Sequence, residues 1–277
     1  RLLNDEGKLI MLPCCHDGLS AVMVERAGFD ATFMSGFCVA ASYGLPDTQL
    51  IGYAEMSAAA RNVTANINIP VIADADTGYG NALNVKRTIK GYAQANVACL
   101  MLEDQVAPKR CGHTKGKSIV SRREAEQRIQ AAVDARREEG LDILIMARTD
   151  ARGTDGVDEA ISRCKSFMEI GADITFLEAP QSIEEMQRYC DEVPGPKMAN
   201  MLENGQTPLL PPPELIEMGY KIAAYPFALL NASIVGMKQA LDQLKRGQSP
   251  ENMSFKELQD IVGFTKYFEE ETRYRHD

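Results

Sequence analysis

The chain has 277 residues, of which 45% are hydrophobic and 25% are charged, and its formal net charge at pH 7 is −9. This length and composition are typical of one large globular domain, and the acidic balance argues against a nucleic-acid or anionic-membrane surface. No apolar run approaches the roughly 20 residues that a membrane helix needs, so we expect no membrane partner.

Eight short apolar segments recur along the chain, and helical patterns separate most of them. The predicted strands are Lys8–Pro13, Ala31–Ser35, Pro70–Ala73, Ala98–Glu103, Asp142–Arg148, Asp173–Glu178, Pro196–Asn200 and Lys221–Tyr225. Nearly continuous apolar runs are typical of strands buried on both faces. Eight strand–helix units in about 250 residues predict an α/β fold of the (β/α)8-barrel type. A doubly wound open sheet is the alternative, because periodicity cannot distinguish a closed sheet from an open one.

No low-complexity segment or linker divides the chain, so residues 1–277 are predicted to form a single barrel domain. The stretch Arg122–Gly140 keeps its apolar residues on one helical stripe. Two further helical segments, Ala228–Arg246 and Phe255–Tyr274, end the chain. We interpret them as a C-terminal helical extension from about residue 228, which could pack on a neighbouring subunit.

Polar residues end nearly every predicted strand. They are Ser35-Gly36, Asp74 with Asp76, Glu103-Asp104, Arg148-Thr149-Asp150, Glu178 and Asn200. Any one of them could be a helix cap, but the active site of a parallel barrel lies at the carboxyl ends of its strands. Together they predict one common site.

A metal site is predicted among the acids. Asp74 and Asp76 are two residues apart on one predicted strand, so both should point to the same face. With Glu103 from the next strand they form a hard oxygen-ligand cluster suited to Mg2+ or Mn2+. Asp47, in the loop after the second strand, could join as an outer acid. Alternatively, one of these acids caps the following helix.

Basic residues surround Cys111 in the segment Asp104–Lys117. They are Lys109, Arg110, His113, Lys115 and Lys117. Flanking cations favour the reactive thiolate, and the glycines of this segment would let it close over the site as a lid. We predict that Cys111 is an acid–base catalyst tuned by His113; the alternative is an inert loop thiol.

These motifs, in the order in which they stand, resemble the isocitrate lyase/phosphoenolpyruvate mutase superfamily over about residues 8–246. The stretches that carry the resemblance are Met34-Ser35-Gly36, Gly44-Leu45-Pro46-Asp47, Asp74-Ala75-Asp76-Thr77-Gly78, Glu103-Asp104-Gln105, Lys109-Arg110-Cys111-Gly112-His113, Ala147-Arg148-Thr149-Asp150, Glu178-Ala179 and Asn200. The resemblance implies a barrel whose terminal helix swaps between subunits, giving a dimer of dimers.

The same resemblance implies that Mg2+ lies near Asp74 and Asp76, with Asp47 and Glu103 around it. A substrate carboxylate or enolate oxygen would bind the metal, the Ser35-Gly36 backbone and Arg148. Cys111 matches the cysteine that protonates a carbanion in the lyase branch. To the substrate-binding set we add four residues: Asp47, Gly112, Asn200 and Thr207.

The cysteine-bearing lid points to a lyase that cleaves a 2-hydroxy di- or tricarboxylate, of the 2,3-dimethylmalate or 2-methylisocitrate type, to pyruvate and a carboxylate. The alternatives on the same scaffold are an oxaloacetate hydrolase and a phosphoenolpyruvate or carboxyphosphonoenolpyruvate mutase. A barrel that has lost its chemistry and serves as a binding module is a further alternative.

The general base is left open. Phe33 stands where a tyrosine is usual, and Phe37-Cys38 replace a run of glycines. Glu178, Tyr79 and a metal-bound hydroxide are therefore all candidates. The expected partners are a small anionic carboxylate and further copies of the chain. The cysteines are odd in number and scattered, which favours the cytoplasm or another reducing compartment. An organellar targeting sequence could have been removed from the chain.

Overall fold

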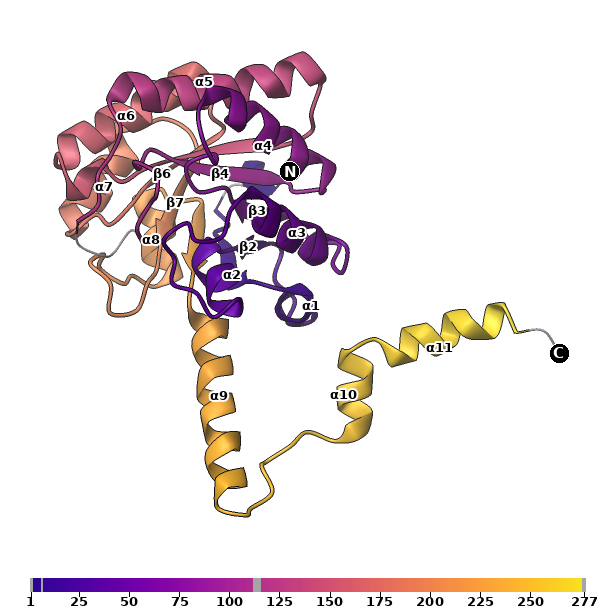
Figure 1. Cartoon of the computed structure of the whole chain (residues 1–277). Helices are drawn as coiled ribbons and strands as arrows, with labels where there is room; N and C mark the ends of the chain where they lie inside the picture. Colours follow the sequence, from indigo (N-terminus) through magenta and orange to yellow (C-terminus); the bar gives the residue numbers. More distant parts are fainter. Residues whose placement is uncertain (1, 6, 112–115, 276–277) are drawn as a thin grey trace. The chain divides into compact units, whose positions relative to one another are not determined.

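The fold is known from a computed structural model, which describes residues 2–5, 7–111 and 116–275. Within these residues eight parallel strands form a closed barrel in the order β1 to β8, and β8 pairs with β1 (Figure 1). The strands are β1 (Ile10–Cys15), β2 (Thr32–Met34), β3 (Val71–Asp74), β4 (Cys99–Glu103), β5 (Leu144–Thr149), β6 (Ile174–Leu177), β7 (Lys197–Asn200) and β8 (Ile222–Tyr225). The predicted (β/α)8 barrel is confirmed, and the open sheet is excluded.

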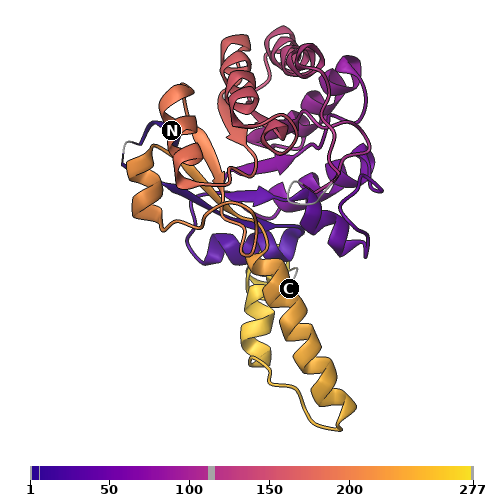
Figure 2. The same cartoon turned by 90° about the vertical axis from the view of Figure 1, so that its left-hand side faces the viewer.

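Helices connect the strands and enclose them, as Figure 2 shows from a second direction. They are α1 (Gly18–Arg26), α2 (Gly36–Ser42), α3 (Tyr53–Thr64), α4 (Ala82–Gln94), α5 (Arg122–Glu139), α6 (Val157–Ile170), α7 (Ile183–Glu192) and α8 (Pro212–Met218). Local signals set their ends. The Ser121 side chain accepts from the Glu124 N–H at the start of α5, and Gly140 ends that helix with φ 61°.

Strand alternation separates two layers of core. Along β4, Cys99 and Met101 belong to the apolar cluster inside the barrel, whereas Leu100 and Leu102 pack outward with the helices. Glu103 continues the inward series, so its carboxylate reaches the barrel interior at the carboxyl end of the strand. The apolar interior of the barrel thus lies directly beneath the polar carboxyl ends of the strands.

The chain divides into two compact units, Arg1–Ala228 and Leu229–Asp277. The first holds the barrel. The second holds most of α9 (Ala228–Lys245), then α10 (Phe255–Ile261) and α11 (Phe264–Arg273). Among the helices that the structure describes, none combines the length and apolar character that a membrane span requires.

Two sequence expectations need correction. The predicted helix Phe255–Tyr274 is two helices, because Gly263 takes a left-handed φ of 93° between α10 and α11. The expectation that Asp74 and Asp76 lie on one strand is also wrong. Strand β3 ends at Asp74, and Asp76 lies in the following turn with φ 48°.

Candidate active site

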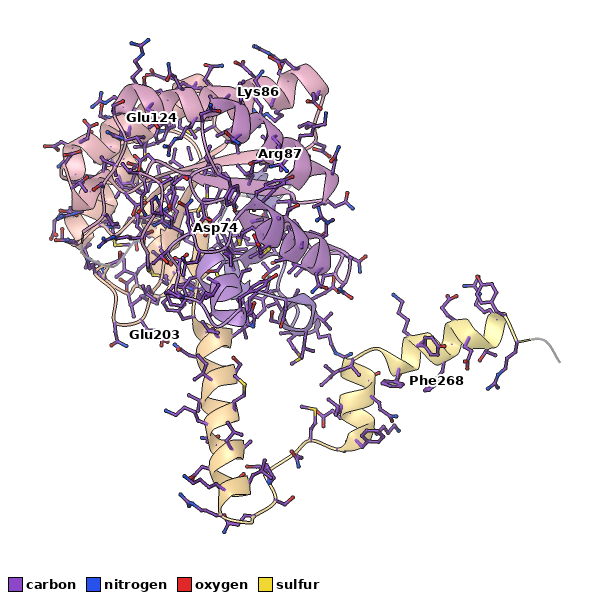
Figure 3. The ribbon with its side chains drawn as sticks, in the orientation of Figure 1. Asp74, Lys86, Arg87, Glu124, Glu203 and Phe268 are labelled. Carbon is purple, nitrogen blue, oxygen red and sulfur yellow. The ribbon has the colours of Figure 1, made fainter. Side chains whose placement is uncertain are left out.

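A cavity lies at the carboxyl ends of the barrel strands. Its polar lining residues are Ser35, Asp47, Asp74, Lys109, Cys111, Arg148, Glu178 and Asn200. Its apolar lining residues include Phe33, Phe37, Phe176, Met198, Leu202, Pro226 and Phe227. Asp74 is buried, and Figure 3 labels it in the middle of the barrel unit, with Lys86 and Glu124 labelled on the outer helices. The predicted convergence of polar strand ends is therefore a feature of the structure.

Arg148 is the best-anchored cation of the cavity. Its Nε donates to Asp150 Oδ2 at 2.9 Å and its Nη2 to Asp150 Oδ1 at 3.2 Å, which is a bidentate fork. Glu103 Oε2 lies 3.3 Å from the same Nε, and Glu178 Oε2 lies 3.9 Å from Nη1. Burial works to lower the pKa of Arg148, but the three acids outweigh it and raise the pKa well above its usual value. Arg148 is thus a fixed, permanent positive charge.

Asp74 organises the end of β3. Its Oδ2 accepts from the Gly36 N–H at 3.1 Å, and its Oδ1 accepts from the Asp76 N–H at 2.9 Å. A Cβ at Gly36 would stand 2.6 Å from Asp74 Oδ2, so this close approach requires glycine. The Tyr92 hydroxyl donates to the Asp74 carbonyl at 2.8 Å, which fixes the backbone from below.

Lys109 connects the Cys111 segment with two of the predicted metal acids. Its Nζ lies 2.6 Å from Asp47 Oδ1 and 3.0 Å from Asp76 Oδ1. Burial works to lower the pKa of Lys109, but the surrounding acids, Asp76 first, raise it well above its usual value. A buried ammonium therefore compensates part of the acid cluster.

Negative charge still exceeds positive charge here. Among the described residues, the acids are Asp47, Asp74, Asp76, Glu103, Asp150 and Glu178, and the cations facing them are Lys109, Lys117 and Arg148. Burial is the main cause that raises the pKa of Asp76 to about 6, and it raises the pKa of Glu103 well above its usual value, against the opposing effect of nearby cations. Such carboxylates are stabilised by an additional cation.

A metal would find suitable donors but no preformed cage. Among the described residues, no three His, Cys, Asp or Glu side chains are already grouped to hold an ion. However, the buried Glu103 Oε1 has no hydrogen-bond partner there. Mg2+ usually binds through one or two carboxylates and several waters, so dispersed acids with a charge surplus fit this ion.

Side-chain amides hold the segment that carries Cys111. Gln105 Oε1 accepts from the Arg110 N–H, and Gln105 Nε2 donates to the Arg110 carbonyl, both at 2.9 Å. The Lys109 N–H donates to Gln49 Oε1 at 2.9 Å. Cys111 is half-buried and lines the cavity.

The other candidates from the sequence are placed as follows. Gly112 and His113 lie outside the described residues. Thr207 is buried but does not line the cavity. The Tyr79 hydroxyl lies 3.2 Å from the Tyr92 hydroxyl, and Tyr79 is not among the residues that line the cavity.

Sequence reasoning missed three features of the site. Lys109 was seen only as part of a basic run, and Asp150 only as a polar strand end. The apolar wall was also missed, in which the Phe37 and Phe227 rings lie 4.4 Å apart between centroids. Lys109 and Asp150 stand beside polar residues that the sequence had already marked, so a local signal for them existed. The apolar wall combines residues far apart in the sequence, so no local pattern signals it.

Comparisons with known proteins agree with this geometry. The family model described as phosphoenolpyruvate phosphomutase matches residues 1–245. The 2,3-dimethylmalate lyase of Eubacterium barkeri is 44% identical over 280 residues, which cover 99% of this chain and 96% of that protein.

Two solved structures extend the comparison. An oxaloacetate acetylhydrolase in complex with the inhibitor 3,3-difluorooxalacetate superposes with a TM-score of 0.94 at 34% identity, covering 98% of this chain and 94% of that one. A phosphonopyruvate hydrolase in complex with oxalate and Mg++ superposes with a TM-score of 0.86 at 26% identity, covering 99% and 96%.

Proposed function

The chain belongs to the phosphoenolpyruvate phosphomutase family, within the isocitrate lyase/phosphoenolpyruvate mutase superfamily, and on that premise we propose that it is a magnesium-dependent carbon–carbon lyase. Its substrate is a 2-hydroxy di- or tricarboxylate of the 2,3-dimethylmalate or 2-methylisocitrate type, and one product is pyruvate. The expectation of a carbon–carbon lyase of this superfamily is confirmed by the lyase relative. The observation that carries the proposal is the placement of Arg148, Cys111 and the acids around one cavity.

The residues divide the work of the reaction between them. A base removes the 2-hydroxyl proton, the bond between C2 and C3 breaks, and its electron pair stays on the departing carboxylate fragment. Glu178 is the proposed base, because it lines the cavity while Tyr79 does not. Cys111 then donates a proton to the carbanion, as a positioned general acid. Arg148 supplies a fixed cation to the substrate oxygens.

Asp74 is the proposed inner ligand of Mg2+, and Asp76, Asp47 and Glu103 would hold it directly or through water. When bound, Mg2+ supplies Lewis-acid stabilisation of the negative charge on substrate oxygens. The charge surplus of the acid cluster supports this assignment, as does the Mg++ in the related phosphonopyruvate hydrolase.

The affinity for Mg2+ should weaken as the pH falls through about 6. Burial raises the pKa of Asp76 to about 6, so below that pH a proton competes with the metal for this carboxylate. For one competing proton, the Kd rises about tenfold per pH unit below the pKa and levels off above it. Titration calorimetry with Mg2+ at several pH values measures this. Asp76→Asn should bind more weakly with a flatter profile, and a Kd that is constant across this range in the unmodified protein contradicts the role of Asp76.

An oxaloacetate hydrolase is the second candidate, because the oxaloacetate acetylhydrolase structure superposes so closely. The 44% identity to the 2,3-dimethylmalate lyase, against 34% to that hydrolase structure, favours the lyase.

A substrate panel separates the two candidates. Purified protein with Mg2+ is incubated with 2,3-dimethylmalate, 2-methylisocitrate, oxaloacetate or phosphonopyruvate, and pyruvate and oxalate are measured. Pyruvate from one or both of the first two substrates supports the lyase. Oxalate from oxaloacetate, with no pyruvate from 2,3-dimethylmalate or 2-methylisocitrate, refutes it.

We also propose that residues 1–277 form one barrel domain whose helical extension, from about residue 228, swaps between subunits in a dimer of dimers. Large apolar side chains are exposed on the second unit, among them Leu241, Phe255, Tyr267 and Phe268. Phe268 is labelled in Figure 3. Light scattering that gives a monomer mass contradicts this assembly. Among the described residues, none of the seven cysteines forms a disulfide, which supports a reducing compartment, the cytoplasm or an organelle. Formation of disulfides in the protein isolated from its cells contradicts that.

A further inference from the structure

The segment that carries Cys111 leaves the barrel and returns to it as a closed excursion. Gln105 and Ile119 form an antiparallel bridge at its base. The Val106 N–H donates to the Ser118 carbonyl at 2.8 Å, and the Val120 N–H to the Asp104 carbonyl at 2.9 Å. Backbone pairing alone therefore closes the base of the excursion.

A buried ion pair is added to this closed base. On the returning strand, Lys117 Nζ donates to Asp150 Oδ1 at 2.9 Å, and the two side chains are 6% and 0% exposed. Burying two charges costs free energy that their attraction repays only when the geometry is good. Next to Lys117, Gly116 lies against Arg110, the residue before Cys111, because a Cβ at Gly116 would stand 2.7 Å from Arg110 Nη1. The flank that Lys117 anchors therefore contacts the residue adjacent to Cys111.

The Asp150 carboxylate, which accepts a hydrogen bond from Lys117, also orients Arg148. Asp150 accepts both N–H groups of the Arg148 fork, and its own N–H donates to Asp104 Oδ1 at 2.9 Å. Asp104 is fixed in turn by Thr149 and Arg163, at 2.6 and 3.0 Å. Asp150 therefore has little freedom to move. A group bound to Asp150 is held at a fixed position relative to Arg148.

We propose that Lys117 is a positioning residue that sets the place of Cys111 relative to Arg148 through their shared partner Asp150. Arg148 holds the substrate oxygens and Cys111 delivers the proton, so the two must keep a fixed separation for the transfer to occur. Burial would raise the pKa of Asp150, but Arg148 and Lys117 together hold that pKa below its usual value, so the Asp150 carboxylate stays ionised. The kinetic part of this inference rests on the proposed function, but the accessibility of Cys111 does not.

The test compares Lys117→Met with a control that loses an ion pair elsewhere. Lys86→Met removes a lysine on α4 that pairs with Glu138 on α5, far from the cavity (Figure 3). The first readout is the rate at which iodoacetamide alkylates Cys111, followed by peptide mass spectrometry, with the half-buried Cys190 of α7 as an internal reference. Lys117→Met should speed alkylation of Cys111 several-fold and leave Cys190 unchanged, whereas Lys86→Met should change neither.

Kinetics give the second readout. A displacement of about 1 Å can cost up to about 10²-fold in turnover, so we expect kcat of Lys117→Met to fall about 10- to 100-fold. Lys117→Arg, which keeps a cation able to bind Asp150, should recover part of this loss. In an Asp150→Asn background, Lys117→Met should add little to the alkylation rate, because their coupling is already lost.

Two outcomes overturn the inference. If Lys117→Met only lowers the free energy of unfolding, with the Cys111 alkylation rate and kcat unchanged, Lys117 is structural. If its effect on alkylation is fully additive with that of Asp150→Asn, the two residues act separately. Should the unmodified protein cleave none of the proposed substrates, the proposed function fails, while the alkylation readout still decides the role of Lys117.

Discussion

Cys111→Ser should lower kcat by about 10²- to 10⁴-fold, the usual contribution of a general acid, while Mg2+ binding stays intact. The side chains are nearly the same size, but a hydroxyl is a far weaker acid than a thiol. It can still occupy the cavity wall but delivers a proton to the carbanion much more slowly. Steady-state kinetics with 2,3-dimethylmalate and Mg2+ calorimetry on the same preparation measure the two effects separately.

Cys190→Ser is the matched control for this change. Cys190 is also half-buried and forms no disulfide, but it lies on α7 and does not line the cavity. Its substitution should leave kcat within about twofold, as for most changes away from functional features. Undiminished turnover of Cys111→Ser would remove Cys111 from the mechanism.

Arg148→Lys should lower kcat/KM by about 10²- to 10³-fold, as expected when a donor to a developing oxyanion is lost. A lysine keeps the positive charge that Glu103, Asp150 and Glu178 require, so the protein should still fold. It cannot reproduce the fork that binds Asp150 through two N–H groups, so the charge is no longer aimed at the substrate. Kinetics at saturating Mg2+ measure the loss, and urea unfolding checks that the variant is folded.

Arg136→Lys is the control for this second change. Arg136, near the end of α5, pairs with the part-exposed Asp173, which precedes β6 and so lies at the opposite end of the barrel from the cavity. It should cost some stability and leave kcat/KM unchanged. Equal losses in the two variants would show that Arg148 acts on stability and not on the substrate.

The barrel was predictable because each strand carries its own signal. All eight predicted strands overlap observed ones, since a strand buried on both faces must be an apolar run whatever its neighbours are. No single strand carries a sequence signal that the sheet is closed. Closure was inferred from the number of units, and the pairing of β1 with β8 now confirms it.

Polar residues at the strand ends were equally predictable, because the carboxyl ends of parallel strands meet at one face. Their partners were not. The contact of Lys109 with Asp47 and Asp76 and the position of Asp150 between Arg148 and Lys117 depend on how a long excursion folds back. The break at Gly263 and the turn at Asp76 are single-residue left-handed conformations, which a hydrophobic pattern does not register.

The most direct test of the proposed lyase is the identity of the products from 2,3-dimethylmalate in D2O with Mg2+, observed by proton NMR. Cleavage between C2 and C3 predicts equal amounts of pyruvate and propionate, with one deuterium on the propionate carbon that was bonded to C2. Intact 2,3-dimethylmalate and intact 2-methylisocitrate, together with oxalate formed from oxaloacetate under the same conditions, would contradict a lyase and identify a hydrolase on this barrel.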